Sequence, residues 1–235
     1  MILGPLFEGL ATIKIHKSEE PISKETPQKY QGLDWDQPPD GYRFSEDSVL
    51  LAEFAPVSME GRALDLGCGC GVVGLEALVK GRLRGITDFY FAELKDYFRP
   101  FLTANLERAK RELSSNMALR AMFRDWRELT TLDFEGPLDY ICCNPPYTPK
   151  GRGRMSGDGK ISSARTEAHG DLRSLIKASS KLLKDGGLLD LTLPRKRLSE
   201  LTAILNHSLL GYQLLSFPPR KGASLALIRL QKHHC

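Results

Sequence analysis

Short apolar runs alternate with amphipathic segments along the chain from Gly61 onward. This alternation predicts an α/β fold with a mostly parallel sheet covered by helices on both faces, because each strand–helix–strand unit returns the chain to the same edge of the sheet. We expect strands at Ala63–Leu66, Phe89–Glu93, Ala118–Phe123, Leu138–Cys143 and Leu188–Leu193. Helices are expected at Val72–Lys80, Asp96–Glu112, Leu172–Lys184 and Lys196–Leu209, and a final antiparallel pair at Tyr212–Phe217 and Ala223–Leu230.

One further helix is expected ahead of the sheet. Ser45 is a suitable N-cap, Glu46 and Asp47 favour the first turn, and Pro56 stops the helix. Its apolar face is expected to consist of Val49, Leu50, Leu51 and Phe54.

The chain has 235 residues, of which 41% are hydrophobic and 26% are charged. These values suit one large domain at 41–235, preceded by an extension at 1–40 that we expect to pack on or near the substrate side. The net charge of +4 permits an anionic partner without requiring one. The apolar start Met1–Ile15 is too short to span a membrane, and no later stretch is long enough. We therefore expect a cytoplasmic protein without a membrane partner.

A glycine-rich turn follows the first expected strand, in Asp65-Leu66-Gly67-Cys68-Gly69-Cys70-Gly71. Glycine lets backbone N–H groups approach a ligand closely, and a side chain on Gly67, Gly69 or Gly71 would block that approach. The stretch Gly69–Gly74 also matches the GxGxxG pattern of dinucleotide sites, and Glu93 follows at the expected distance. The turn alone thus predicts a nucleotide-like cofactor and leaves a nicotinamide dinucleotide open.

Acidic residues come at the ends of the second and third expected strands. Glu93 can accept hydrogen bonds from both hydroxyls of a ribose. Asp125 can accept from an adenine amino group with Trp126 packed nearby, although an aspartate there is also a common helix N-cap. We assign these residues, Cys68 and the glycines to the cofactor site.

Five cysteines occur, without a CxxC pair, and their odd number argues against a secreted disulfide framework. The pairs Cys68/Cys70 and Cys142/Cys143 both lie at expected strand ends, where they could approach one another. Small residues in a tight turn and a buried strand of a cytosolic protein explain them better than zinc does. We expect no metal.

The motif Asn144-Pro145-Pro146-Tyr147 follows the fourth expected strand, at the carboxyl edge of the sheet where α/β proteins bind ligands. The Asn144 side-chain oxygen and the Pro145 carbonyl can accept the two N–H groups of a ring-bound amine, which is otherwise a poor nucleophile. The two prolines stiffen the backbone. Tyr147 offers a flat face on which a base can stack. Asn144, Pro145 and Tyr147 are therefore the expected catalytic residues, with Asn144 also facing the cofactor.

With these pieces, the chain resembles the class I methyltransferases that use S-adenosylmethionine (SAM), and within them the group that includes bacterial tRNA(Val) adenine-N6 methyltransferases. The resemblance rests on Asp40–Ser45 leading into Asp47–Leu51, the glycine turn, Glu93, Asp125 and Asn144–Tyr147. It implies a Rossmann-like seven-stranded sheet of order 3-2-1-4-5-7-6 with strand seven antiparallel. It also implies SAM as cofactor, S-adenosylhomocysteine as product, an acidic residue at Asp65 that favours SAM, and a segment around Phe44 that covers the SAM site.

The substrate that the motif would serve is less narrowly defined. The Gly-rich loop at 148–170 carries Lys150, Arg152, Arg154 and Arg165, which could contact the phosphates of an RNA such as tRNA. The first 35 residues and this loop match the family least well, and both would contact substrate. Glutamine-N5 protein methyltransferases share the motif and guanine-N2 rRNA enzymes use a close variant, so both stay open, as does a SAM-binding partner protein without catalysis. Monomer and homodimer are not distinguished.

Overall fold

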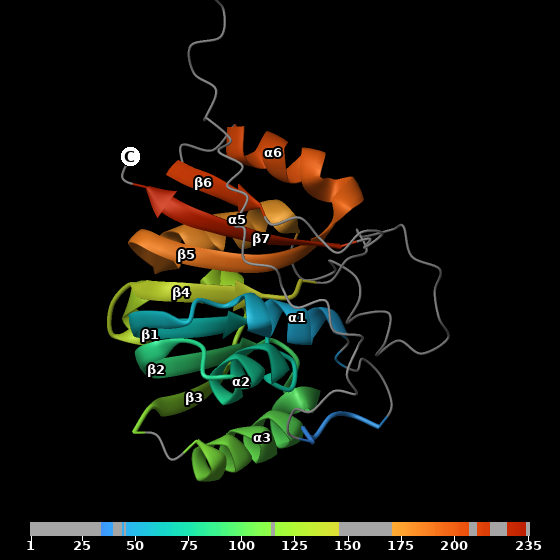
Figure 1. The fold of residues 1–235 in the computed structure, drawn as a ribbon, viewed down its shortest axis with the longest axis vertical. Coiled ribbons are helices and arrows are strands. Elements are labelled where there is room, and N and C mark those ends of the chain that lie inside the picture. The colour runs from blue at the N-terminus through green and yellow to red at the C-terminus, as the bar shows by residue number, and fades with distance from the viewer. Residues whose placement is uncertain are drawn as a thin grey trace, which may run out of the picture.

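The computed structural model describes residues 34–39, 44, 46–113, 116–145, 171–206, 211–216 and 225–233. Seven strands of this part of the chain form one sheet of order β3-β2-β1-β4-β5-β7-β6, which confirms the predicted order (Figure 1). Only β7 runs against its neighbours, pairing antiparallel with β5 and β6. The strands are β1 Ser58–Leu66, β2 Arg84–Glu93, β3 Ala118–Phe123, β4 Leu138–Cys143, β5 Leu183–Pro194, β6 Gly211–Ser216 and β7 Leu225–His233.

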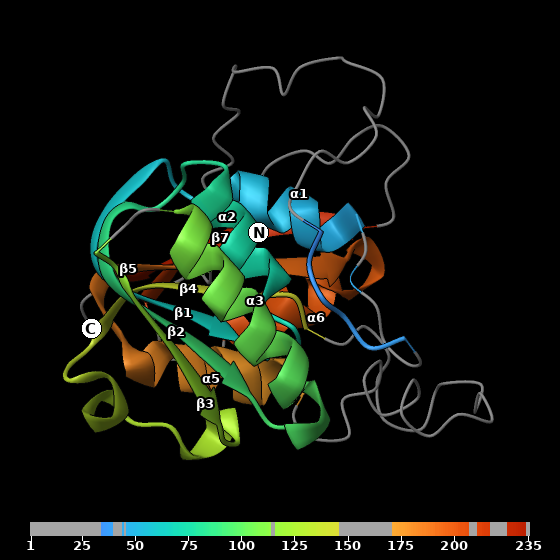
Figure 2. The ribbon, with the colours of Figure 1, turned by 90° about the horizontal axis from the view of Figure 1, so that it is seen from below.

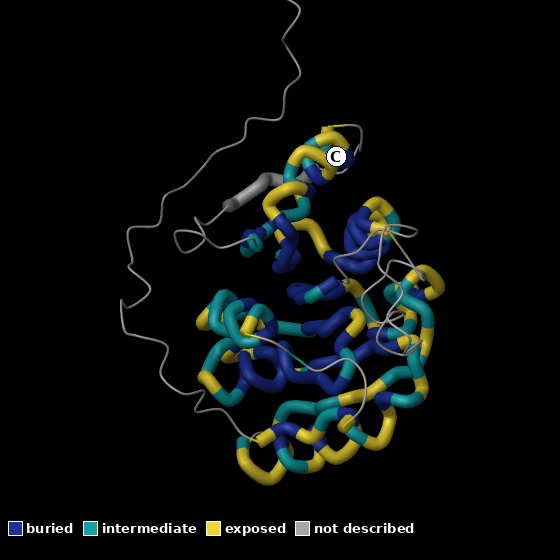
Figure 3. The backbone as a smooth tube through the Cα atoms, turned by 90° about the vertical axis from the view of Figure 1, so that its right-hand side faces the viewer, coloured by how far each residue is buried: buried dark blue, intermediate teal, exposed yellow. Residues whose placement is uncertain are grey.

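Helices cover both faces of this sheet, as the alternating pattern predicts (Figure 2). One face packs against α1 Glu46–Phe54, α2 Val72–Val79 and α3 Arg99–Glu112, and the other against α5 Leu172–Leu182 and α6 Leu198–Asn206. Each face carries its own apolar cluster, and β4 between them is buried along its whole length (Figure 3). A strand buried on both faces reads as a continuous apolar run, as Leu138–Cys143 does.

The largest boundary difference concerns β5. The sequence predicts a helix to Lys184 and a strand from Leu188, whereas the helix ends at Leu182 and the strand begins at Leu183. Leu183 pairs with Leu138, while the next pair joins Leu188 to Tyr140, so β5 bulges between them. Gly186 adopts a φ of 79° in this bulge. The two glycines that read as a helix stop therefore accommodate extra strand residues.

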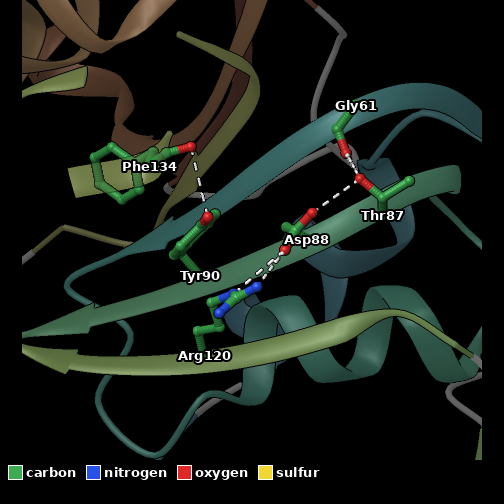
Figure 4. A network of polar contacts seen from close by, with 6 residues as sticks. All are labelled: Gly61, Thr87, Asp88, Tyr90, Arg120 and Phe134. Atoms are coloured by element: carbon green, nitrogen blue, oxygen red, sulfur yellow. Dashed lines mark hydrogen bonds and ion pairs between the residues drawn. The ribbon is translucent and has the colours of Figure 1, made fainter. Parts of the chain in front are cut away.

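Side chains of β2 and β3 and two backbone carbonyls form a polar network toward the β3 edge of the sheet (Figure 4). Arg120 of β3 donates two hydrogen bonds to Asp88 of β2, at 3.2 and 3.0 Å. The Thr87 hydroxyl lies 3.2 Å from the carbonyl oxygen of Gly61 in β1, and the Tyr90 hydroxyl lies 3.5 Å from that of Phe134. These contacts tie β1, β2 and β3 together. On this side of the sheet, the candidate cofactor residue Glu93 ends β2 and the candidate Asp125 follows β3.

The described part of the N-terminal extension packs against α2 and α3. The Trp35 indole N–H donates to Glu76 of α2. The Asn105 side chain of α3 accepts from the backbone N–H of Asp36 at 2.7 Å and donates to the Asp36 carbonyl and the Cys70 carbonyl, both at 2.8 Å. Asn105 thus links this segment to the glycine turn.

Candidate active site

The glycine turn is fastened to the end of β2 by backbone hydrogen bonds. The N–H groups of Gly67 and Cys68 donate to the carbonyl of Ala92 at 2.8 and 3.0 Å. Gly67, Gly69 and Gly71 have φ values of 72°, 57° and 83°, in the left-handed region that favours glycine. Gly67 itself is exposed at the end of β1. The N–H groups of Gly67, Cys68 and Gly69 thus donate within the protein, and Gly67 is the exposed residue of the turn at the carboxyl edge of the sheet.

The surroundings that an added side chain would meet differ between these three glycines. A Cβ at Gly71 would lie 2.8 Å from a methyl group of Leu102 in α3, whereas a Cβ at Gly69 would meet only the Phe98 ring, at 3.7 Å. A Cβ at Gly67 would lie 3.3 Å from the Trp126 ring. At Gly71 the protein's own packing already excludes a side chain, so its expected part in ligand approach stays a prediction.

Asp65 is buried beneath the turn, with 1% of its surface exposed. Its carboxylate accepts the backbone N–H of Gly74 at 2.9 Å. Gly74 is the third residue of α2, and Gly71 at the N-cap has no side chain to supply such an acceptor. Desolvation by burial raises the pKa of Asp65 to about 7, while the hydrogen bond from Gly74 acts in the opposite direction and the charge of Glu93 adds to the rise. Asp65 therefore caps α2.

Glu93 has both carboxylate oxygens held by backbone. One accepts from the N–H of Gly69 at 2.9 Å and the other from the N–H of Lys95 at 2.8 Å. A carboxylate offers about four acceptor positions, so these two bonds orient the group and leave acceptor capacity for ribose hydroxyls. The residue is 8% exposed, at the end of β2 beside the turn.

Asp125 and Trp126 follow β3. Asp125 accepts from the backbone N–H of Arg127 at 2.9 Å and forms an ion pair with the Arg127 guanidinium, so the N-cap role is present. The Trp126 ring lies against Gly67, and its indole N–H is buried without a hydrogen-bond partner among the described residues. Phe44 is half-buried and packs on the apolar cluster of the α1–α3 face.

Asn144 lies at the end of β4, next to the glycine turn. Asp65 of β1 pairs with Cys142 of β4, and continuing this register by two residues places Asn144 beside Gly67. The Asn144 Nδ2 donates to the Ser48 hydroxyl of α1 at 3.0 Å. The Thr192 hydroxyl of β5 donates to Asn144 Oδ1 at 2.5 Å.

Ser48 and Thr192 are the residues that sequence reasoning missed at this position. Ser48 and Thr192 are 3% and 1% exposed, Asn144 is half-buried and Pro145 is buried. The expected apolar face of α1 did not include Ser48. Tyr147, Lys150, Arg152, Arg154 and Arg165 lie outside the described residues, so their predicted roles stay predictions.

The four described cysteines, Cys68, Cys70, Cys142 and Cys143, are buried and free. Burial raises the pKa of Cys70 to about 12, and it raises the pKa of each of the other three thiols well above its usual value. Such thiols stay protonated at neutral pH, whereas nucleophilic and metal-binding cysteines act as thiolates. The described residues contain no group of three or more His, Cys, Asp or Glu that could hold a metal ion. None of their helices is long and apolar enough to cross a membrane.

A family described as "methyltransferase small domain" matches residues 43–215. The tRNA1(Val) (adenine(37)-N6)-methyltransferase of Shewanella sediminis is 30% identical over 172 residues, which cover 73% of this chain and 68% of the relative. The protein of the same name from Shewanella sp. strain MR-4 is 27% identical over 201 residues, or 82% of this chain and 79% of the relative. Among solved structures, a predicted O-methyltransferase from Agrobacterium tumefaciens shares the fold, with a TM-score of 0.55 and 22% identity over 80% of this chain and 81% of that one.

Proposed function

The chain belongs to the methyltransferase small domain family, and we propose that it transfers a methyl group from SAM to the exocyclic N6 of an adenine in tRNA. The observation that carries the chemical part is that Asn144 directly follows β4, which pairs in parallel with β1, the strand that the glycine turn follows. An amine acceptor beside a nucleotide-binding turn suits methyl transfer to nitrogen. The tRNA substrate rests on the names of the curated relatives, which are 24–30% identical to this chain.

The residues present fit SAM. Gly67 is exposed and neither Gly67 nor Gly69 carries a side chain that would obstruct a ligand, and Glu93 keeps acceptor positions for ribose hydroxyls while its two backbone bonds orient it. Phe123, which precedes Asp125 by two residues, pairs with Glu93 across the sheet, which brings the β2 and β3 ends to one adenosine-sized region. Asp65 supports this surface indirectly, through α2.

Bound SAM supplies an electrophilic methyl group on a positively charged sulfur, and the product is S-adenosylhomocysteine. Asn144 Oδ1 accepts one N–H of the adenine amino group, and the Pro145 carbonyl accepts the other. These bonds orient the nitrogen lone pair and favour the tetrahedral geometry that the nitrogen reaches as the new C–N bond forms. As that bond forms, the nitrogen releases one proton to solvent. Tyr147 provides a stacking surface for the base.

A basic surface next to Asn144 favours RNA as substrate. The exposed Arg195 and Lys196 follow β5 directly, at the edge of the sheet where Asn144 follows β4. Arg197 does not extend this surface, because it is 6% exposed and its guanidinium donates two hydrogen bonds to Glu200. Two outward cations at this edge suit phosphate contacts, which strengthen binding without reading sequence.

The test is methyl transfer from labelled SAM to separate pools of unmodified tRNA, rRNA and total protein, followed by nucleoside analysis. Label in tRNA as N6-methyladenosine supports the proposal. Label in protein as methylglutamine, or in rRNA as N2-methylguanosine, refutes the substrate and keeps the amine chemistry. In parallel, Asn144→Ala is expected to lower turnover at least about 100-fold with SAM affinity nearly unchanged, as the loss of a transition-state hydrogen bond does. Unchanged turnover would remove Asn144 from the mechanism.

A further inference from the structure

We propose that Ser48 and Thr192 are positioning residues that clamp the Asn144 amide in the orientation needed for methyl transfer. This inference rests on the proposed function, since it concerns how Asn144 meets the substrate amine. The clamp consists of two hydrogen bonds at opposite ends of one side-chain amide: Nδ2 to Ser48 at 3.0 Å and Thr192 to Oδ1 at 2.5 Å. Both hydroxyls come from elements distant in sequence, α1 and β5.

The sheet places Thr192 beside Asn144. Cys143 of β4 pairs with Leu191 of β5, and one further residue on each strand brings Asn144 opposite Thr192. Strand residues alternate between faces, and Leu191 and Leu193 belong to the apolar cluster of the α5–α6 face. Thr192 therefore points to the opposite face, where α1 carries Ser48. The contact follows from the register of the central strands, and any chain with this pairing would bring position 192 to the amide.

The two hydroxyls fix the amide and leave it able to act. An amide oxygen has two lone pairs, so the bond from Thr192 does not by itself use up its capacity to accept the amino group of the substrate. An asparagine that rotates freely about χ2 would populate unproductive orientations part of the time, and small misplacements of catalytic groups lower the reaction rate strongly. Ser48 and Thr192 do not need to touch the substrate, which is why their effect should pass entirely through Asn144.

The position of α1, which carries Ser48, is itself fixed by a buried ion pair. Arg229 of β7 donates to the Phe54 carbonyl at the end of α1 at 2.7 Å, and its guanidinium lies 4.6 Å from the Phe54 ring. The same guanidinium donates two bonds of 2.7 Å to Asp190, which also accepts from Tyr140 at 3.0 Å. Asp190 and Thr192 lie on the same face of β5. One strand face thus anchors the C-terminal end of α1 through Asp190 and binds Asn144 through Thr192.

The decisive experiment compares Thr192→Val, which keeps the shape and removes the hydroxyl, with Thr192→Ser, which keeps the hydroxyl. With tRNA as substrate, Thr192→Val is expected to lower kcat about 10- to 100-fold, with the Kd for SAM changed less than about twofold. Thr192→Ser should restore kcat to within about threefold of the unmodified protein. Ser48→Ala tests the other arm, and Ser180→Ala, which removes a buried hydroxyl on α5, is the matched control.

A purely structural role is excluded by repeating Thr192→Val in an Asn144→Ala background. The clamp predicts no further loss of kcat there, because groups that act as a unit are not additive. An equal fold-loss in both backgrounds, an unchanged kcat, or a Thr192→Ser variant as slow as Thr192→Val would each overturn the proposal. These comparisons require only that the unmodified protein labels one of the three pools.

A second readout needs no substrate. In protein labelled with ¹⁵N-asparagine, the side-chain signals of Asn144, assigned by their absence in Asn144→Ala, should shift and exchange faster with solvent in Ser48→Ala and Thr192→Val. Unchanged signals in both variants would overturn the clamp. Failure of the unmodified protein to methylate tRNA would refute the proposed substrate and leave this measurement standing.

Discussion

Replacing Asp65 with asparagine is expected to change how stability depends on pH. Asparagine keeps an oxygen that can accept the Gly74 N–H and removes the ionisable group. Burial raises the pKa of Asp65 from 3.8 to about 7, so the folded protein favours the protonated carboxyl. The stabilisation that comes with that proton is complete below pH 3.8 and is lost as the pH rises through 7.

The magnitude follows from the two pKa values. A shift of roughly three units corresponds to about 4 kcal/mol when the group is fully ionised in both states. Between pH 5 and pH 8 the wild-type protein should lose about 2.5 kcal/mol of unfolding free energy relative to Asp65→Asn. Urea unfolding of both proteins at pH 5, 6.5 and 8 measures this difference, with Asp34→Asn as a control that removes an exposed carboxylate. A difference between Asp65→Asn and wild type that stays constant across these pH values would refute the reasoning.

Three other changes test the remaining parts of the site. Gly71→Ala should destabilise the protein by about 2 kcal/mol or more, because strain at positive φ adds to a clash at 2.8 Å. Gly186→Ala is the control for the strain alone, because Gly186 has a similar φ and no atom within 4 Å of the added Cβ. Equal shifts of the melting temperature in both variants would contradict the packing argument. Glu93→Gln should weaken SAM binding about tenfold or more by calorimetry with the fold intact, since the charge-assisted bonds to ribose are lost, and unchanged affinity would remove Glu93 from the site. Replacing Arg195 and Lys196 together with alanine should raise the KM for tRNA and lower its dependence on salt by about two charges while kcat holds, and an unchanged salt slope would show that neither cation meets phosphate.

The strands could be predicted because apolar runs are local signals, whereas their order in the sheet came from the resemblance to the class I methyltransferases. Glycines and strand-end acids are likewise visible within a few residues. The start of β5 at Leu183 could not be predicted, because Gly186 and Gly187 read as a helix stop when no partner strand is considered. The role of Gly71 was also hidden, since its clash partner Leu102 lies on another helix.

Asp65 has a structural role that its local sequence pattern does not reveal. An acid before a glycine turn suggests a direct ligand contact, but a carboxylate that is 1% exposed and bonded to Gly74 acts on the turn from beneath. Its effect on cofactor binding, where it has one, would pass through α2. Glu93 differs because it lies beside the turn with both oxygens oriented by backbone N–H groups and with acceptor positions remaining.

The sequence around Thr192 contains a pattern whose meaning becomes clear only once the fold is known. Along Leu188–Leu193 the polar Asp190 and Thr192 alternate with leucines, although this strand is almost wholly buried. Buried polar groups need partners, so two of them on one face of an interior strand imply two partner groups on the element that covers this face. That element is α1. The carbonyl at its C-terminal end accepts a hydrogen bond from Arg229, which also donates to Asp190. Its Ser48 and Thr192 of β5 both hydrogen-bond to the Asn144 amide. If the proposed clamp holds the Asn144 amide for catalysis, substitutions on that face of β5 should affect turnover through Asn144 before they affect SAM binding.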